Sequence, residues 1–338
     1  MDKHTDTFTD YLMKYTKKEL TAIARLHHMP RYSVFPKTEL AEQLSSFLLY
    51  PATMAAFFPY LGKDELDIIT SHSQIMDSSL TRRLREGGYC FKNQDGTFIV
   101  PNEVAENVFS NHSILNLQHK KSFFVDCLYA AGYLYGCAPI SILLKMYNSP
   151  MDSSISREDF IKLFHEIPDY FNPFILKNDL CIHLSLYDRN LYQQIQKCQG
   201  TLPFYIPSKE DVIYLARYGY FPADSHDKRL AAVLKQLSDE DAYTICGNIQ
   251  AVFRQGGTIS DALTFLNQKY KITPPPSKDR PLLSALNEVF IHTRLLLNRG
   301  YTTAQTLRLK KKMTKIYPNS PCICGSGKKY KNCCGRRR

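Results

Sequence analysis

Apolar residues recur at helical spacing in two segments near the N-terminus. Thr16–Glu19 has the form of a capping box, and apolar positions at helical spacing begin at Leu20. After a polar break at Pro30, the same spacing returns over Lys37–Leu48. Residues 12–50 are therefore predicted to form a helix, a short extended connection and a second helix.

The pattern over residues 52–115 changes from helical to strand-like toward its end. A helix is predicted over Ser78–Glu86, where two glycines end it. The runs Tyr89–Lys92 and Thr97–Val100 have strand character and are joined by a tight turn at Asp95-Gly96. Helices followed by a β-hairpin are the element order of a winged helix, so we interpret this segment as winged-helix-like.

Residues 120–205 repeat that order by pattern, without repeating residue identities. A start signal at Ser156 predicts one of its helices, and Asn178-Asp179 lies at the turn of its hairpin. We interpret this segment as a second winged-helix-like unit. Its other predicted elements are helices over Phe123–Tyr135 and Ile140–Tyr147 and strands over Phe174–Leu176 and Leu180–Leu184.

The last third of the chain is predicted to be helical. Start signals at Ser208 and Ser238 indicate an all-helical domain over residues 208–272, followed by a stiff linker of three prolines. Residues 278–316 are predicted to hold a long helix and a final basic helix. The long helix is expected from about Pro281 to Asn298, and the basic helix from Thr302. The predicted fold class is mainly α with small β-hairpin wings.

One uncharged stretch, Cys127–Leu144, invites comparison with a membrane span. Its two glycines, its proline and its tyrosines favour two short buried helices that meet at a turn. The first ten residues are polar and contain no apolar core of a secretory signal. We therefore expect no membrane span and a cytoplasmic, bacterial type of protein.

The ten cysteines fall into two groups. Six are scattered without framework spacing, mostly among apolar neighbours, with Cys198 as the exception. We expect these six to be core thiols of a protein in a reducing compartment. The remaining four lie within the last seventeen residues and require a different explanation.

The formal net charge of +11 is concentrated at the C-terminus. Thr306–Arg338 contains 11 Lys and Arg residues and no acidic residue, so the rest of the chain is balanced. A local excess of this kind favours nucleic acid, anionic lipid or an acidic protein surface as a partner.

The clustered cysteines have the spacing C-x-C-x8-C-C, formed by Cys322, Cys324, Cys333 and Cys334. Zn2+ prefers four soft ligands in a tetrahedron, and four thiolates leave no open position. We therefore predict one structural Zn2+ bound by these four residues. The alternative is a group of free or disulfide-bonded cysteines, but adjacent cysteines rarely bridge each other and a reducing compartment disfavours a bond.

The residues around these cysteines resemble the SEC-C motif, through Asn319, Pro321, the Gly325–Lys331 segment and Gly335. The motif is named for the C-terminal tail of the bacterial preprotein translocase ATPase. The resemblance implies a small zinc-binding tail that docks a chaperone, the ribosome or an anionic surface. Ile323 and Ser320 depart from the usual pattern without removing a ligand. The GSGKK string is no P-loop, since Cys322 stands where its first glycine belongs.

The N-terminal pair of helices resembles helix-extended-helix modules, which include SAP modules and the small N-terminal domain of the transcription terminator Rho. Relatives of this kind commonly bind nucleic-acid backbones. The resemblance implies phosphate contacts from exposed cations. The alternative is a helical pair that only packs on the next domain. The candidate residues are Lys17, Lys18, Arg25, His28, Arg31 and Lys37.

In the first winged-helix-like segment, Ser78–Glu86 occupies the recognition-helix position. It carries Arg82, Arg83 and Arg85, whose side chains suit phosphates or guanine edges. The alternative is a solvated helix face on a fold used for protein contacts.

Enzyme motifs are absent from the chain: it has no H-E-x-x-H, G-x-S-x-G or dinucleotide fingerprint. The sequence therefore favours a zinc-binding, non-enzymatic protein that binds DNA, RNA or a nucleoprotein such as the ribosome. The alternative is a protein–protein adaptor whose zinc tail docks a chaperone, the ribosome or another acidic partner. The tail candidates for nucleic-acid contact are Lys310, Lys311, Lys312, Lys328, Lys329, Lys331, Arg336, Arg337 and Arg338.

Overall fold

The chain folds into two compact units in the computed structural model. Unit 1 comprises Met1–Gln196 with Ile206–Pro222, and unit 2 comprises Lys197–Tyr205 with Ala223–Arg338. The structure describes residues 6–71, 75–76, 79–110, 118–151, 154–188, 190–273, 276–313, 319, 328–332 and 336. Across these residues the protein is mainly helical with two small sheets, which confirms the predicted fold class. None of their helices is long and apolar enough to cross a membrane.

Unit 1 begins with three short helices that pack together. They are α1 (Phe8–Met13), α2 (Lys17–Leu26) and α3 (Lys37–Leu48). The predicted capping box is confirmed, because the Thr16 hydroxyl accepts from the Glu19 amide and the Glu19 carboxylate accepts from the Thr16 amide. The connection between α2 and α3 contains a 3-10 turn at Tyr32–Val34, so the expectation of a purely extended connection is wrong.

The next elements of unit 1 surround a small hairpin. The predicted hairpin is confirmed, with Phe91 opposite Ile99 and a turn in which Asp95 accepts from the Thr97 amide. Of the helix expected over Ser78–Glu86, the described residues form a helix at Arg82–Glu86, and Ser78 lies outside them. The elements are α4 (Pro51–Phe57), α5 (Lys63–Ser71), α6 (Arg82–Glu86), β1 (Phe91–Lys92), β2 (Phe98–Ile99) and α7 (Asn102–Ser110).

Aromatic rings join these helices to the hairpin. Tyr89 is fully buried, and its ring contacts Phe8, Phe57 and Phe58. Its hydroxyl donates to the Leu48 carbonyl at 3.1 Å, so the one polar atom of this ring is satisfied. The N-terminal helices and the first hairpin consequently share one core.

The rest of unit 1 contains a three-stranded antiparallel sheet of order β3-β5-β4. The second predicted hairpin is confirmed, with Ile175 opposite Ile182. The uncharged stretch does form two buried helices, but a strand separates them where only a turn was expected, because Cys137 pairs with Ile182. The elements are α9 (Gln118–Leu134), β3 (Cys137–Pro139), α10 (Ile140–Asn148), α11 (Arg157–Glu166), β4 (Phe174–Lys177), β5 (Leu180–His183), α12 (Leu184–Tyr187), α13 (Leu191–Gln199) and α14 (Lys209–Tyr218). The last three residues of α13 belong to unit 2.

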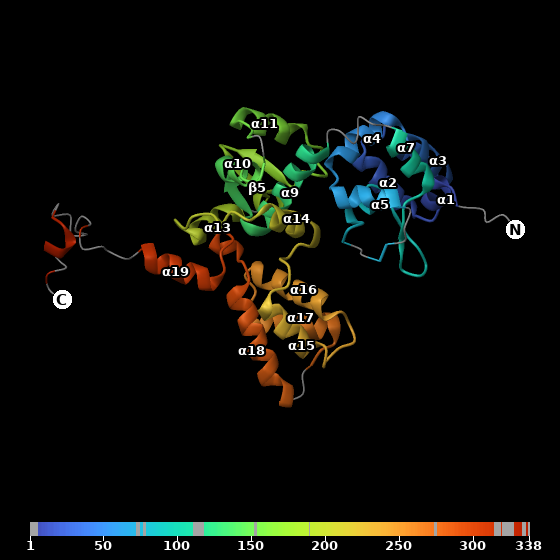
Figure 1. Ribbon diagram of the computed structural model, residues 1–338. Helices are drawn as coiled ribbons and strands as arrows, with labels where there is room; N and C mark the ends of the chain where they lie inside the picture. The colour runs from blue at the N-terminus through green and yellow to red at the C-terminus, as the bar shows by residue number, and fades with distance from the viewer. Residues whose placement is uncertain are drawn as a thin grey trace. The chain divides into compact units, whose positions relative to one another are not determined.

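Unit 2 is a helical domain in its described part (Figure 1). Helix α15 packs against α16 and α18 around a core that includes Leu230, Ile249, Phe253 and Leu286. Because α14 belongs to unit 1, the predicted helical domain 208–272 extends over parts of both units. The helices are α15 (Ser225–Leu234), α16 (Ala242–Arg254), α17 (Ile259–Tyr270), α18 (Pro276–His292) and α19 (Thr303–Met313).

The long helix of unit 2 ends earlier than its apolar pattern predicts. Helix α18 stops at His292, where the Thr293 hydroxyl bonds back to the Val289 carbonyl at 2.7 Å. The amides of Leu295 and Gly300 then close a tight loop. The basic helix α19 follows as predicted.

Candidate functional site

The cysteine motif lies at the C-terminal end of unit 2. Its four predicted zinc ligands, Cys322, Cys324, Cys333 and Cys334, lie outside the described residues, as do Arg337 and Arg338. Between the cysteine pairs, Tyr330–Asn332 forms a 3-10 turn in which the Asn332 amide donates to the Lys329 carbonyl at 2.9 Å. The turn places cations between the two pairs at the surface. The exposed cations between the pairs are Lys328, Lys329 and Lys331, and Arg336 is exposed after the second pair.

The remaining six cysteines are thiols without disulfide bonds. Five are buried, and Cys198 is exposed, in agreement with the expectation from their neighbours. Burial raises the pKa of Cys90 and of Cys181 to about 12 each, so these thiols stay protonated and inert at neutral pH. These buried thiols therefore provide no thiolate ligand for a soft metal ion at neutral pH.

The predicted cations of the N-terminal helices are all at the surface. The Arg25 side chain donates to the Tyr32 hydroxyl at 3.3 Å, next to the turn that joins α2 to α3. This arrangement leaves the N-terminal set accessible to a partner, and its predicted role in nucleic-acid binding stays a prediction. The exposed members are Lys17, Lys18, Arg25, His28, Arg31 and Lys37.

The three arginines of α6 do not form an open recognition face. Arg83 is 5% exposed, and its guanidinium donates to Glu65 Oε1 at 2.8 Å and to Asp126 Oδ1 at 3.2 Å. The expectation that Arg83 presents its charge at the surface is therefore wrong. The reason is that two buried carboxylates need a cation, which the helix spacing alone does not reveal.

Arg82 and Arg85, the other two members, are half-buried and already engaged within unit 1. Arg82 donates to the Ala216 carbonyl at 3.3 Å and lies over the Tyr129 ring. Arg85 donates to the Thr81 hydroxyl at 3.2 Å and lies over the Phe98 ring. Contacts of this kind hold the two side chains against the protein.

A second buried arginine completes a charge cluster that the sequence did not indicate. Arg217 of α14 contacts Glu65 at 2.6 Å, so two guanidiniums face two carboxylates and the cluster is neutral. Burial raises the pKa of Asp126, and Arg83 offsets this only in part. Burial also opposes ionisation of Glu65, but Arg83 and Arg217 together hold its pKa below the ordinary value. The cluster links α5, α6, α9 and α14.

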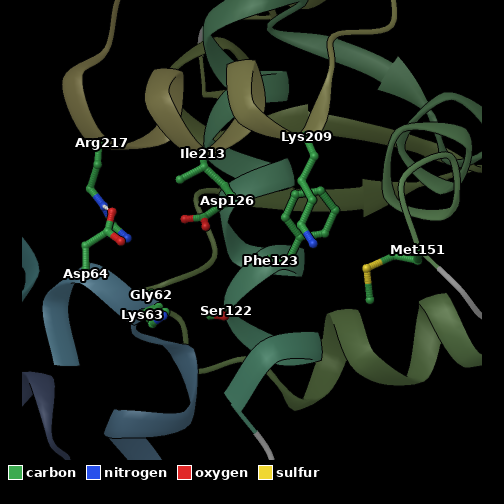
Figure 2. A pocket seen from close by; sticks show the side chains of 10 residues that line it. All are labelled: Gly62, Lys63, Asp64, Ser122, Phe123, Asp126, Met151, Lys209, Ile213 and Arg217. Carbon is green, nitrogen blue, oxygen red and sulfur yellow. Dashed lines mark ion pairs between the residues drawn. The ribbon is translucent and has the colours of Figure 1, made fainter. Parts of the chain in front are cut away.

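A small pocket lies beside this charge cluster (Figure 2). Its volume is about 140 Å³, below the roughly 300–1,000 Å³ of typical sites for small molecules. Arg217 points toward Asp64 at its edge, 3.9 Å away, and Asp126 lines its wall. A volume of this size has room for a few water molecules.

Comparison with known proteins identifies the tail. The model of the SEC-C motif matches residues 319–336, a range that includes all four clustered cysteines. The protein translocase subunit SecA of Syntrophus aciditrophicus is 46% identical over 43 residues, which are 13% of this chain and 5% of that protein. SecA of Lachnoclostridium phytofermentans is 63% identical over 38 residues, 11% of this chain and 4% of that protein.

The likeness to these translocase subunits is confined to short stretches. A third SecA, from Finegoldia magna, is 75% identical over 24 residues, 7% of this chain and 3% of its own length. The chain thus spans only 3–5% of the length of these relatives. No solved structure matches the chain. The chain carries a SEC-C motif, a zinc-binding type of motif.

Proposed function

We propose that this chain is a zinc-dependent docking protein that binds an acidic protein partner through its SEC-C tail. Cys322, Cys324, Cys333 and Cys334 would hold one structural Zn2+. The observation that carries the proposal is the SEC-C match over residues 319–336, with all four thiolate donors in place. The proposed function contains no catalytic step.

The charge of the tail supports an acidic partner. Four thiolates and one Zn2+ together carry about −2, so the segment from Thr306 onward keeps about +9. Exposed lysines lie in the sequence between the two cysteine pairs. A partner with a negative surface would be drawn to this segment over a range set by ionic strength.

Two observations favour a protein over a nucleic acid as the partner. Three relatives that match the chain over short stretches are subunits of a protein translocase. In addition, the α6 face predicted to bind nucleic acid lacks one of its three cations, because Arg83 is paired with the buried Glu65 and Asp126. The N-terminal helices, which resemble helix-extended-helix modules, keep their cations exposed. Binding of nucleic acid is therefore the alternative outcome of the test.

The second winged-helix-like segment points the same way. We propose that α9, β3, α10, α11, β4 and β5 form a winged-helix unit, which their order and the β3-β5-β4 sheet support. In that unit α11 would take the recognition-helix position. Its exposed charges are mixed and net acidic, with Glu158, Asp159 and Glu166 against Arg157 and Lys162. Such a face lacks the excess of positive charge that phosphate contacts need, and it suits a protein contact.

The test is capture of partners by the full-length, zinc-loaded chain in nuclease-treated extract. We expect a specific protein to be retained, and Cys333→Ser to lose both the zinc and that protein. Cys198→Ser is the matched control, because Cys198 is exposed and lies outside the motif. Metal analysis of the same samples reports zinc separately from the partner.

Either of two results would overturn the proposal. A wild-type chain purified without chelator that holds no zinc removes the structural ion. Retention that disappears with nuclease, and returns with added RNA or DNA, assigns the tail to nucleic acid.

A further inference from the structure

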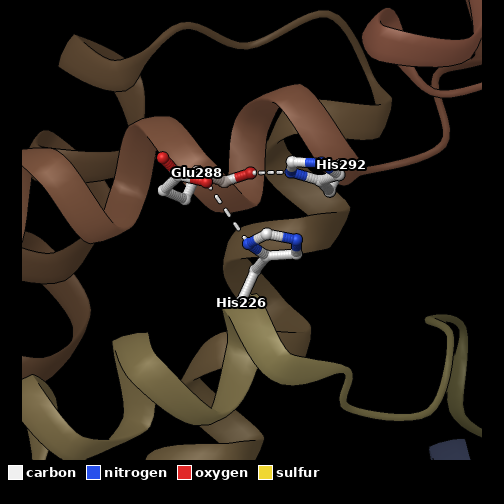
Figure 3. A group of neighbouring side chains, drawn as sticks. All are labelled: His226, Glu288 and His292. Carbon is white, nitrogen blue, oxygen red and sulfur yellow. Dashed lines mark hydrogen bonds and ion pairs between the residues drawn. The ribbon is translucent and has the colours of Figure 1, made fainter.

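Three metal-ligating side chains converge in unit 2, on elements far apart in the sequence. His226 lies in the first turn of α15, and Glu288 and His292 lie one turn apart at the end of α18 (Figure 3). Their donor atoms all lie within 4.8 Å of one another, and all three side chains are half-buried. Since α15 packs directly on α18, the arrangement belongs to the core packing of the unit.

The protonation of His292 is set by its backbone contact. His292 Nδ1 lies 2.9 Å from the carbonyl oxygen of Glu288. A carbonyl only accepts hydrogen bonds, so Nδ1 carries the proton and the neutral ring holds its lone pair at Nε2. Metal-binding histidines are commonly oriented in this way, with one nitrogen tied to a carbonyl and the other directed at the metal.

His226 approaches the same carboxylate from the other helix. Its Nδ1 lies 3.3 Å from Glu288 Oε2. This nitrogen is buried and has no hydrogen-bond partner among the described residues. A tetrahedral zinc site with bonds of about 2.0–2.1 Å has edges of about 3.3–3.4 Å, which is the separation of these two atoms.

The two imidazoles stack with ring centroids 3.7 Å apart and planes 8° from parallel. Parallel rings this close cannot both aim their in-plane lone pairs at one ion, so ion binding requires one half-buried ring to turn about its side-chain torsions. A simple ion pair accounts for His226 and Glu288 alone. That ion pair leaves out His292, whose donor nitrogen also lies within 4.8 Å of theirs.

We propose that His226, Glu288 and His292 form a second metal site, specific for a divalent transition-metal ion such as Zn2+. The ligands are His226 Nδ1, the Glu288 carboxylate and His292 Nε2, and water fills the fourth position on the half-exposed side. Two imidazoles and a carboxylate are a donor set that zinc accepts with an open position. The ion joins α15 to α18 and stabilises unit 2. This site is independent of the proposed tail function.

Cobalt substitution in the full-length chain tests the site, because thiolate ligation and nitrogen–oxygen ligation give different spectra. The apo protein, prepared with chelator and reductant, is titrated with Co2+. We expect about two ions per chain, one with the thiolate charge-transfer band of the tail and one without it. His226→Ala and His292→Ala each lose only the second ion. Glu288→Gln, which keeps the side-chain volume, weakens it at least tenfold. His165→Ala is the control, because His165 is exposed on α11.

A measurement on the unaltered protein keeps the proposal testable if a variant fails to fold. X-ray absorption of the zinc-loaded wild type is expected to show nitrogen or oxygen neighbours besides sulfur. A shell of sulfur alone, or a second ion retained by both histidine variants, overturns this site. Loss of the thiolate band instead, with the second ion retained, counts against the tail and leaves this site standing.

Discussion

At the scale of single residues, burial decides which histidine has a structural role. His27 directly follows α2 and is 9% exposed, and its Nε2 lies 2.8 Å from the carbonyl of Gly87. Its ring contacts Phe57 and Tyr89 in the aromatic core. Burial lowers the pKa of His27 to about 4, although the bond to Gly87 opposes this shift. The folded protein therefore holds this ring neutral.

The first prediction concerns acid stability. The unfolded chain binds a proton on His27 near pH 6.5, and the folded chain only near pH 4, so stability falls as pH is lowered through this window. Between pH 7 and pH 4.5 we expect His27 to account for a loss of about 2–3 kcal/mol. His27→Gln should remove this part of the pH dependence in urea unfolding. His28→Gln, an exposed neighbour, should retain it, and equal slopes for both variants would refute the assignment.

At the scale of elements, one neutral charge cluster fixes four helices of unit 1. Arg83 and Arg217 bring α6 and α14 to the carboxylates on α5 and α9. Glu65 also accepts from the Gly62 amide at 2.7 Å, where an added Cβ would lie 1.9 Å from the Arg217 guanidinium. The packing of these helices thus depends on a glycine and on complete pairing of the charges.

The second prediction is that Arg83→Met destabilises unit 1 strongly. Removing one guanidinium leaves two buried carboxylates with a single partner, which costs about 3–5 kcal/mol. Arg157→Met removes an ion pair with Asp179 whose side chains are 47% and 62% exposed, and should cost less than about 1 kcal/mol. Urea denaturation followed by circular dichroism measures both. Similar midpoints for the two variants would show that the cluster contributes little.

At the scale of the whole molecule, the cysteines divide by position in the chain. Five of the six described thiols are buried, and Cys198 is exposed. For the four tail thiols, we propose protection by zinc.

The third prediction follows from this division. Iodoacetamide should modify Cys198 in the zinc-loaded native protein and the four tail cysteines only after a chelator is added, because the metal ties up each thiolate. Mass spectrometry of peptides locates the modified residues. Rapid modification of Cys333 without chelator would argue against a four-thiolate site.

The fourth prediction separates the two basic regions. Lys328, Lys329 and Lys331 are exposed and can be substituted without disturbing a core. Removing the tail by truncation after Gln305 would instead cut α19 beside the buried Thr306, so we choose substitution. Replacing the three lysines by glutamine should weaken partner binding at low salt and flatten its salt dependence. The same replacement at the exposed Lys17, Lys18 and Lys37 should change neither. The reverse outcome, measured by titration across a salt series, would move recognition to the N-terminal helices.

Local sequence signals predicted most helices and turns, because helix caps and tight turns form between residues that are neighbours in the chain. The capping box at Thr16, the hairpin turn at Asp95 and the basic helix after Thr302 are settled within a few residues. The end of α18 was missed because its apolar pattern continues past His292, where bonds to Val289 and Tyr301 close a loop. The strand β3 was missed because it forms only by pairing with β5. Arg83 was misplaced for the same reason: its carboxylate partners are 18 and 43 residues away.

The sequence by itself determined the chemistry of the tail, because a zinc-binding motif needs only four donors at the right spacing and a short turn between them. It also determined the charge asymmetry and the helical class. Tertiary structure alone decided which charges are buried and which histidines meet, as with His226 and the pair on α18. Such groupings arise when long-range packing brings distant segments together, and no periodicity along the chain records them.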